Sequence, residues 1–342
     1  MDEGDFEQRL WWLVHHELIE QDHRALDDAL DRTSRSSTTT FRIVDFLREH
    51  PAVLGRPAGA TSRAGPGSPE LGSLGRDSAR QFEHLLYRRN QFIHLSDTER
   101  ASLEGLYREG LYRELFAAVA VPIARDASEA ELATAASGVL QAHFARLLRF
   151  VDDLWHGPAS ARGFVLSSAV SSEYSPDLQL AVLGVELGEL QEPILDVGCG
   201  EAAPLVRWLR DQGMDATGID RLATPAPFVA VRDWLTYDYG VRRWGSILSH
   251  LGFSNHFVVY DQCGGGMARD YAGAYMAMLR SLRESGTFFY APALPFIERH
   301  LPSADFAVSR HTVASDAFER LDCATRHALR AVAQAARVRR LR

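Results

Sequence analysis

The stretch that decides the fold is PILDVGCGEAAPLVRWLRDQGMDATGID, residues 193–220 of a 342-residue chain. Its apolar beginning ends at Asp196, a turn containing Gly198 and Gly200 follows, and a helix is expected to begin near Ala203. Glycine is required where the backbone turns sharply or lies so close to a ligand that a side chain would collide with it. The stretch therefore predicts a strand, a tight turn whose amides face a ligand, a helix and a second strand.

Acidic residues stand at the ends of three successive predicted strands. Asp196 ends the first, Asp220 ends the second, and Asp233 follows the third, where Trp234 offers an aromatic face. In open α/β sheets the ligand lies in the crevice at the carboxyl ends of the strands. A carboxylate at the end of the second strand can accept hydrogen bonds from both ribose hydroxyls of an adenosine group. We therefore expect these acids to line a site for a ligand that contains adenosine.

The second half of the chain alternates short apolar runs with helical stretches, which predicts an α/β fold with a doubly wound, mostly parallel sheet. The expected strands are residues 194–197, 216–219, 228–231, 246–251 and 287–291. At the C-terminus, four arginines predict a solvated tail, with a local basic patch as the alternative. They are Arg337, Arg339, Arg340 and Arg342.

The first half of the chain is expected to be helical, because apolar residues recur every three or four positions. Ser96 with Glu99 and Ser128 with Glu131 have the spacing of a capping box. In that motif the serine and the glutamate each satisfy a free backbone amide at the start of a helix. These pairs predict helices that begin after Ser96 and after Ser128.

Two domains are expected, because 342 residues exceed the usual size of a single core. Residues 1–165 are predicted to form a helical cap that covers the substrate or mediates dimerisation, and residues 166–342 to form the ligand-binding domain. Residues 55–78 are rich in Gly, Pro and Ser and predict a flexible loop. That loop is either a lid over the site or a plain surface insertion.

Composition argues against several classes of protein. All 37 basic residues are arginine, so no lysine is present to form a Schiff base or to grip phosphate in a Walker loop. A formal charge of −8 argues against an extended nucleic-acid surface. The cysteines at 199, 263 and 323 have no metal-binding spacing, and neither a secretory leader nor a long apolar segment is found. These features predict a cytoplasmic protein that does not span a membrane.

The motifs LDVGCGE, GID and RDW resemble, in order and approximate spacing, the glycine-rich, ribose-binding and adenine-binding motifs of class I S-adenosylmethionine-dependent methyltransferases. The resemblance covers about residues 190 to 300, and it implies the Rossmann-like fold of that family with S-adenosylmethionine as cofactor. The family has a single G-x-G where nicotinamide enzymes have G-x-G-x-x-G, and this chain has Ala203 in place of the third glycine. That difference favours methyl transfer over hydride transfer.

The resemblance also implies roles for individual residues. The residues implied to contact the cofactor are Asp196, Gly198 and Gly200 at its methionine end, Asp220 at its ribose, and Asp233 with Trp234 at its adenine. Tyr174 and Gln179, just before the first strand, are expected to meet the methionine group or the acceptor. The alternative for these two is a segment that simply packs on the sheet.

The segment SHLGFSNHF, residues 249–257, follows the fourth strand, where this family places residues near the transferred methyl group. His256, ahead of His250, is the candidate general base for a hydroxyl acceptor, since histidine accepts a proton near neutral pH. The alternative for His256 is a hydrogen bond that caps the end of the strand. Asn255 is the candidate for orienting the acceptor, and Phe253 for walling the pocket.

Two further groups of residues are weighed as sites. Tyr290 and Glu298 follow the fifth strand and are expected to contact substrate, because loops at this edge of a sheet commonly do so. Two histidine clusters show no recognised ligand spacing, so no metal site is expected. They are His15, His16 and His23 near the start, and His300, His311 and His327 near the end.

The predicted function is S-adenosylmethionine-dependent methyl transfer to an oxygen or nitrogen atom of a small molecule of specialised (natural product) metabolism. The acidic charge, the helical cap and the lack of an N-P-P-Y motif favour a small acceptor over a nucleic acid. One alternative is a methyltransferase-fold protein that catalyses a non-methylating elimination or cyclisation, or acts as a partner subunit. Another is a methyltransferase whose N-terminal helices dock a carrier protein. Amphipathic helices outside the core also make a homodimer a reasonable expectation.

Overall fold

The computed structural model describes residues 69–89, 91–125, 127–154, 174–263, 266–313 and 334–342. The chain divides into two compact units, Met1–Ala169 and Val170–Arg342. The predicted domain boundary, between residues 165 and 166, lies outside the described residues. Among the helices that are described, none has the length and apolar character needed to cross a membrane.

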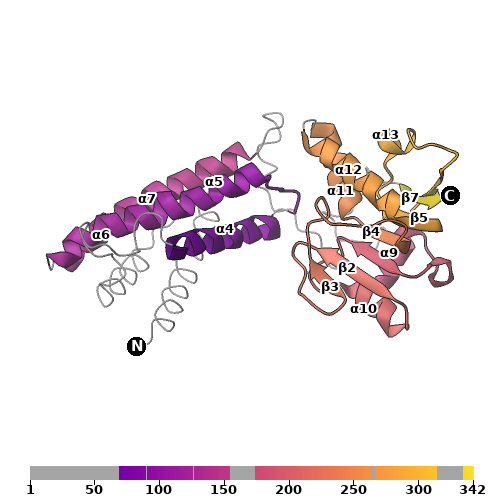
Figure 1. Cartoon of the computed structure of the whole chain (residues 1–342), viewed down its shortest axis with the longest axis horizontal. Coiled ribbons are helices and arrows are strands. Elements are labelled where there is room, and N and C mark those ends of the chain that lie inside the picture. The colour runs from indigo at the N-terminus through magenta and orange to yellow at the C-terminus, as the bar shows by residue number, and fades with distance from the viewer. Residues whose placement is uncertain (1–68, 90, 126, 155–173, 264–265, 314–333) are drawn as a thin grey trace. The chain divides into compact units, whose positions relative to one another are not determined.

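The described part of the N-terminal unit is built from helices (Figure 1). They are α4 (Pro69–Arg89), α5 (Asp97–Tyr107), a π-helical segment (Arg108–Arg113), α6 (Glu114–Ala124) and α7 (Glu129–Asp153). Both predicted capping boxes are confirmed. The hydroxyls of Ser96 and Ser128 accept a bond from the amide of the glutamate three residues on, and the side chain of that glutamate accepts from the serine amide. The two serines therefore set where α5 and α7 begin.

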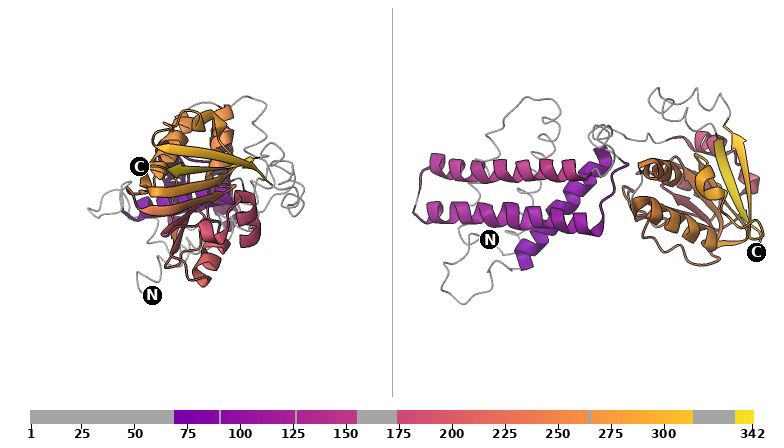
Figure 2. Two further views of the ribbon diagram at one scale, coloured as in Figure 1. Left: turned by 90° about the vertical axis from the view of Figure 1, so that its right-hand side faces the viewer. Right: turned by 90° about the horizontal axis from the view of Figure 1, so that it is seen from above.

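Helix α6 lies antiparallel beside α7, and α4 crosses α5 (Figure 2). Arg146 of α7 holds the π-helical segment in place. Its guanidinium donates to the carbonyl oxygen of Gly110 at 2.6 Å and pairs with Glu114 at 3.0 Å. A Cβ on Gly110 would lie 3.0 Å from that guanidinium. The arginine can therefore reach the backbone because residue 110 has no side chain.

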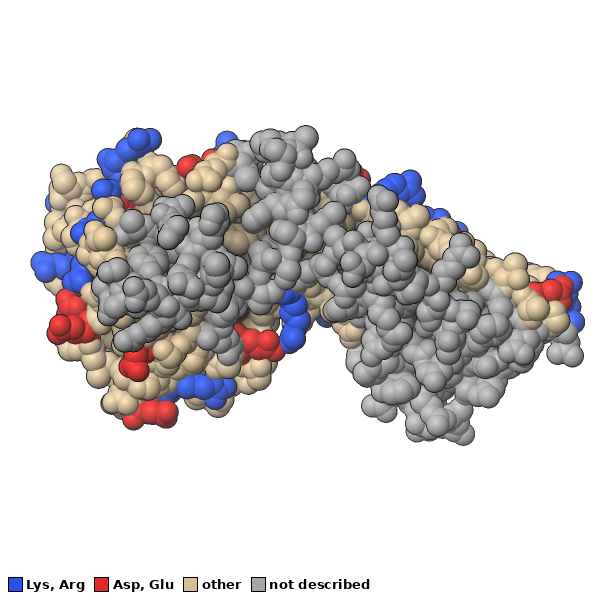
Figure 3. Space-filling model, turned by 180° about the vertical axis from the view of Figure 1, so that it is seen from behind, with Lys and Arg blue, Asp and Glu red and all other residues tan. Residues whose placement is uncertain are grey.

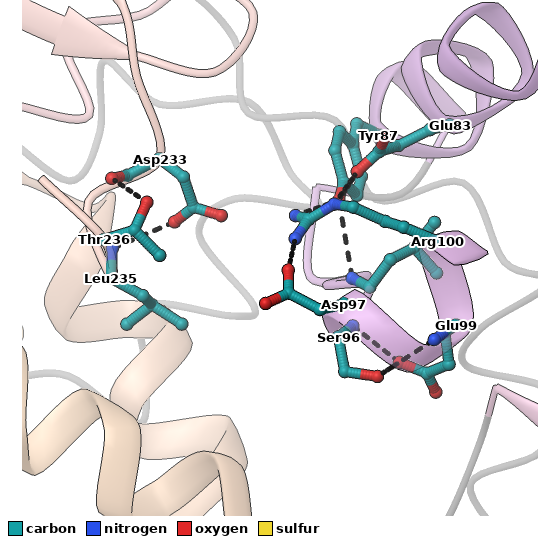
Figure 4. Close-up of polar contacts among 10 residues, drawn as sticks. Glu83, Tyr87, Ser96, Asp97, Glu99, Arg100, Asp233, Leu235 and Thr236 are labelled. Atoms are coloured by element: carbon teal, nitrogen blue, oxygen red, sulfur yellow. Dashed lines mark hydrogen bonds and ion pairs between the residues drawn. The ribbon is translucent and has the colours of Figure 1, made fainter. Parts of the chain in front are cut away.

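Arg100 ties the start of α5 to the end of α4 (Figure 4). Its Nε donates to Glu83 at 2.8 Å, and the hydroxyl of Tyr87 donates to the same carboxylate oxygen at 2.5 Å. Asp97 pairs with the other side of the guanidinium at 3.2 Å. The shared carboxylate of Glu83 is mostly buried, which makes these bonds stronger than those of an exposed ion pair.

The predicted flexible loop over residues 55–78 is wrong for residues 69–78, because α4 begins at Pro69. Residues 55–68 lie outside the described part of the chain. The small residues serve close packing here instead of flexibility. A Cβ on Gly75 would lie 2.8 Å from Cβ of Arg108, and the hydroxyl of buried Ser78 lies 2.5 Å from that of Tyr112. Tertiary contact with the π-helical segment thus outweighs the local preference for a loop.

The described residues of the C-terminal unit form a seven-stranded sheet in the order β3-β2-β1-β4-β5-β7-β6. The strands are β1 (Ile194–Val197), β2 (Ala216–Asp220), β3 (Val229–Val231), β4 (Trp244–His250), β5 (Leu282–Ala291), β6 (Phe306–Thr312) and β7 (Gln334–Arg340). Neighbouring strands from β3 to β5 are parallel, and β7 is antiparallel to β5 and β6. The predicted doubly wound, mostly parallel fold is confirmed, and all five expected strands are present.

Helices cover both faces of this sheet (Figure 1). They are α9 (Pro176–Leu183), a 3₁₀ turn (Leu187–Glu189), α10 (Pro204–Asp211), α11 (Phe253–Cys263), α12 (Gly266–Ser281) and α13 (Pro295–Glu298). Ile194 and Leu248 pack in one core with α9 and α10, whereas Leu195 and Ile247 pack in the other with α11 and α12. Because side chains alternate along a strand, Asp196 faces the same side as Ile194, towards α9 and α10.

The prediction of a solvated tail at residues 337–342 is wrong, because β7 lies inside the sheet between β5 and β6. Ala336 and Val338 are fully buried. The guanidinium of Arg337 lies 5.4 Å from the ring of Phe289 and donates to the carbonyl oxygen of Gly184 at 2.7 Å. Arginine dominates the composition of this segment, but pairing with two strands that are distant in sequence determines its structure.

Gly184 provides a test of how tightly α9 packs on β6. This residue ends α9 with a φ of +61°, and a Cβ there would overlap the imidazole of His311. We expect Gly184→Ala to lower the free energy of unfolding by about 1–3 kcal/mol, since the left-handed conformation is strained for alanine and the imidazole must move. Denaturant-dependent hydrogen exchange in peptides of β4 and β5 measures this for the α/β unit alone.

Gly213→Ala is the matched control. Gly213 also has a positive φ, of +83°, but a Cβ there would meet nothing within 4 Å. This variant should lose only the backbone contribution, about 1 kcal/mol. Equal losses in the two variants would show that contact with His311 contributes nothing.

Candidate functional site

The turn between β1 and α10 lies against the turn that follows β4. Gly198 and Gly200 have φ values of +82° and +79°, in the region that favours glycine. A Cβ on Gly198 would lie 3.2 Å from Cα of Gly252 and 3.3 Å from the ring of Trp234. A side chain at residue 198 would therefore force the two turns apart. At the carboxyl edge of the sheet, the ends of β1 and β4 meet backbone to backbone.

Asp220, the last residue of β2, organises the same turn. Its Oδ2 accepts a hydrogen bond from the amide of Gly200 at 3.2 Å, and its Oδ1 accepts one from the amide of Leu222 at 2.8 Å. Burial raises the pKa of this carboxyl, and the two backbone bonds oppose that rise. Each carboxylate oxygen can accept a further bond, so Asp220 can bind a diol while it keeps its contact with the turn.

Asp196 is a buried carboxyl with incomplete hydrogen bonding. Its side chain is 1% exposed, and its Oδ2 has no hydrogen-bond partner among the residues that the structure describes. Burial, together with the nearby charge of Asp220, raises its pKa to about 7. A buried carboxylate without compensation is costly. This position therefore favours a ligand that brings positive charge and hydrogen-bond donors.

Asp233 and Trp234 follow β3. Asp233 accepts a bond from the amide of Leu235 at 2.9 Å and so forms part of a local turn (Figure 4). Trp234 is 5% exposed, its indole N–H donates to the hydroxyl of Tyr271 at 3.4 Å, and the guanidinium of Arg221 lies 5.7 Å from its ring. Trp234 thus belongs to the core beneath the glycine turn. Its contact with adenine, and that of Asp233, stay predictions.

His250 is the last residue of β4 and is 7% exposed. Burial lowers its pKa to about 3, so the ring is neutral at physiological pH and is a weak base. This weakens the prediction that His250 removes a proton from the acceptor. The ring of Tyr174 lies 5.0 Å from the ring of His250, edge to face. Gln179 holds Tyr174 in place by donating to its carbonyl oxygen at 2.8 Å.

His256 lies in the first turn of α11 and not at a strand end as predicted, because β4 stops at His250 and the chain turns through Gly252. Its Nδ1 lies 3.3 Å from the hydroxyl of Tyr271, and its ring lies 5.0 Å from that of Trp234. Because Trp234 donates to the Tyr271 oxygen, the hydroxyl proton of Tyr271 is directed towards Nδ1. This arrangement favours the neutral ring with its proton on Nε2.

The start of α11 is tied to the end of β1. The hydroxyl of Ser249 donates to the carbonyl oxygen of Val197 at 2.9 Å and accepts from the amide of Phe253 at 3.1 Å. Phe253 is fully buried, and its ring lies 5.3 Å from that of Tyr271. Phe253 therefore packs in the core behind the site, whereas Asn255 is partly buried on the same helix.

Glu298 and Tyr290 belong to a buried network. Oε1 of Glu298 accepts from the hydroxyl of Tyr290 at 2.7 Å and from the amide of Leu294 at 2.6 Å, and Oε2 pairs with Arg310 at 2.5 Å. The hydroxyl of Tyr275 lies 3.0 Å from that of Tyr290. The carboxylate is thus compensated within the fold. These residues tie α13 to β5 and β6, and the structure lends no support to the substrate contacts predicted for Tyr290 and Glu298.

Of the two histidine clusters, His300 and His311 alone lie within the described residues. The others, His15, His16, His23 and His327, lie outside them. Within the described part of the chain, no group of three side chains is placed so that it could hold a metal ion. The expectation that the protein has no metal site stays a prediction.

The raised pKa of Asp196 predicts a pH-dependent stability. A folded-state pKa of about 7 lies above the ordinary value of 3.8, so the folded state binds this proton more tightly and its contribution to stability is lost as pH rises towards 7. We expect Asp196→Asn to raise the free energy of unfolding by roughly 1–3 kcal/mol at pH 8 and by little at pH 4. Denaturant-dependent hydrogen exchange at both pH values checks this. The same pH dependence in both proteins would contradict it.

The Glu298 network predicts a loss of stability without a loss of ligand binding. We expect Glu298→Gln to lower the free energy of unfolding by about 1–3 kcal/mol, because Arg310 loses its anionic partner. The Arg310 side chain is 35% exposed, so solvent limits the loss. Hydrogen exchange in β5 peptides measures it.

Arg342→Gln is the control for that experiment. The side chains of Arg342 and Asp305 form an ion pair but are 71% and 37% exposed. An exposed pair contributes little, so this variant should change the free energy of unfolding by less than about 0.5 kcal/mol. A Glu298→Gln variant as stable as the wild type would argue against the structural role of the network.

No protein-family model matches the chain, and no curated protein matches it. Two solved structures are similar to part of it. One is the plantazolicin methyltransferase BpumL in complex with SAH, which is 15% identical over 49% of this chain and 83% of that chain, with a TM-score of 0.32. The other is a complex between the Haloferax volcanii Trm112 methyltransferase activator and a methyltransferase, which is 17% identical over 48% of this chain and 90% of that chain, with a TM-score of 0.32.

Proposed function

We propose that the chain is an S-adenosylmethionine-dependent methyltransferase whose cofactor binds at the carboxyl edge of β1, β2 and β4. One observation carries the proposal, namely a glycine turn between two acids. Gly198 and Gly200 are in left-handed conformations, Asp196 is buried just before the turn, and Asp220 accepts a bond from it. The motif that resembles methyltransferases contains these residues, and the fold brings them to one edge of the sheet.

The charges at this edge suit a ligand with a cationic end. S-adenosylmethionine has a sulfonium and an ammonium group, which supply the positive charge that Asp196 lacks. A dinucleotide would instead bring a pyrophosphate next to two buried acids, Asp196 and Asp220. Helix α10 also begins with Pro204, which has no N–H to offer an anion at the helix N-terminus. The site therefore favours S-adenosylmethionine over a nicotinamide dinucleotide.

Methyl transfer from a sulfonium is an in-line displacement, in which the protein aligns nucleophile, methyl group and sulfur and excludes water. The alignment contributes on the order of 7–11 kcal/mol. Bound S-adenosylmethionine supplies the methyl group. Asn255 and His256 on α11 orient the acceptor, and Tyr271 directs the His256 ring towards donating its Nε2 proton. Orientation of the acceptor is therefore the role that the geometry favours for His256 over proton removal.

A small molecule is the acceptor that the surface supports. The formal charge is −8, and Figure 3 shows acidic and basic side chains interspersed on the visible face of the α/β unit. An extended phosphate backbone needs a continuous basic surface instead. We therefore propose transfer to an oxygen or nitrogen atom of a small molecule of specialised metabolism. The cytoplasmic location, the homodimer and the carrier-protein contact stay predictions.

Calorimetric titration of the full chain with S-adenosylmethionine tests the cofactor site. We expect saturable binding by the wild type and affinity at least about tenfold lower in Asp220→Ala, because hydrogen bonds from the ribose to a charged group are lost. Asp305→Ala, at the opposite edge of the sheet, is the matched control and should bind normally. NADH is the control ligand and should not bind.

Each outcome of this titration has a clear meaning. Binding of S-adenosylmethionine without methyl transfer to any acceptor would favour a non-methylating elimination or cyclisation, or a partner-subunit role. A folded wild type that binds neither S-adenosylmethionine nor S-adenosylhomocysteine would overturn the proposal.

A further inference from the structure

Two polar atoms on one face of the sheet are buried and, among the described residues, have no hydrogen-bond partner. They are Oδ2 of Asp196 and Nε2 of His250. Asp196 pairs in register with Leu248 on the adjacent strand. Because side chains alternate along a strand, His250 is the next residue of β4 on the same face. Both side chains are more than nine-tenths buried, at 1% and 7% exposed.

A ligand that bonds to both atoms accounts for this arrangement. Each polar group buried without a partner costs about 1–3 kcal/mol, so two of them on neighbouring strands are an expensive feature of the fold. The two groups do not bond to each other. A metal ion is a poor match, because the described residues supply no third ligand there.

Resting on the proposed function, we propose that Asp196 and His250 together bind the primary ammonium of the cofactor's amino-acid end. One N–H is donated to Oδ2 of Asp196, and a second is donated to Nε2 of His250. His250 is then a positioning residue for the cofactor, not the base that removes a proton from the acceptor.

The surroundings of His250 suit this role. A neutral imidazole presents a lone pair on one ring nitrogen, and the low pKa of His250, about 3, keeps that lone pair available at physiological pH. Tyr174 lies edge-on against the ring and shields it from water. An ammonium also brings the positive charge that the buried carboxyl of Asp196 requires, whereas a hydroxyl brings a single donor and no charge.

A pair of ligands isolates the ammonium contact. S-adenosylhomocysteine has the amino-acid end, whereas 5′-methylthioadenosine has the same adenosine and thioether without it. We expect His250→Leu in the full chain to weaken S-adenosylhomocysteine binding by about tenfold or more, since a charge-assisted bond is lost. The affinity for 5′-methylthioadenosine should stay unchanged. His250→Gln, whose carbonyl oxygen can accept the same bond, should restore most of the affinity.

Controls separate this inference from the proposed function. Exposed His300→Leu should leave both affinities unchanged, and His250→Met is a second apolar variant, for which binding of 5′-methylthioadenosine reports that the protein has folded. If the wild type binds neither ligand, the proposed function fails. If the wild type binds both, but the apolar His250 variants weaken both equally or neither, the ammonium contact is overturned and His250 contributes packing alone.

Discussion

Contact between two turns is the constraint on which the α/β unit depends. The turn after β1 lies against the turn after β4 at Gly198 and Gly252, with no room for a side chain at residue 198. Ser249 reinforces the contact by bonding both to the end of β1 and to the first amide of α11. Because the two turns are held together, residues from β1, β2 and β4 meet at one edge of the sheet. The candidate site is therefore a product of backbone packing before it is a product of side-chain chemistry.

Two buried carboxyl groups show how their surroundings separate a binding role from a structural one. Glu298 receives donors from Tyr290, Leu294 and Arg310, so its charge is compensated within the fold. Asp196 is buried as deeply, yet one of its oxygens has no partner among the described residues and its pKa is raised to about 7. A group that the fold compensates stabilises the fold, whereas one that the fold leaves uncompensated favours binding of a complementary ligand.

The two histidines near the end of β4 lie six residues apart but belong to different sides of the sheet. His250 faces the α9–α10 layer and lies against Tyr174, whereas His256 lies on α11 with Trp234 and Tyr271. Their neighbours give them different chemistry. Burial makes His250 a neutral, weakly basic ring, and the hydroxyl of Tyr271 orients the proton of His256. The order of residues along the chain shows none of this.

The sequence by itself determined the sheet from β1 to β5, the glycine turn with its flanking acids and both capping boxes, because strand patterns, positive-φ glycines and helix starts are local properties. An isolated glycine just after β4, Gly252, was a further signal of close backbone approach. The tertiary structure alone decided that β7 enters the sheet, that Gly75 and Ser78 pack in a helix, and that Glu298 is compensated by Arg310. These outcomes depend on contacts between segments distant in sequence, whose burial and pairing no local pattern records.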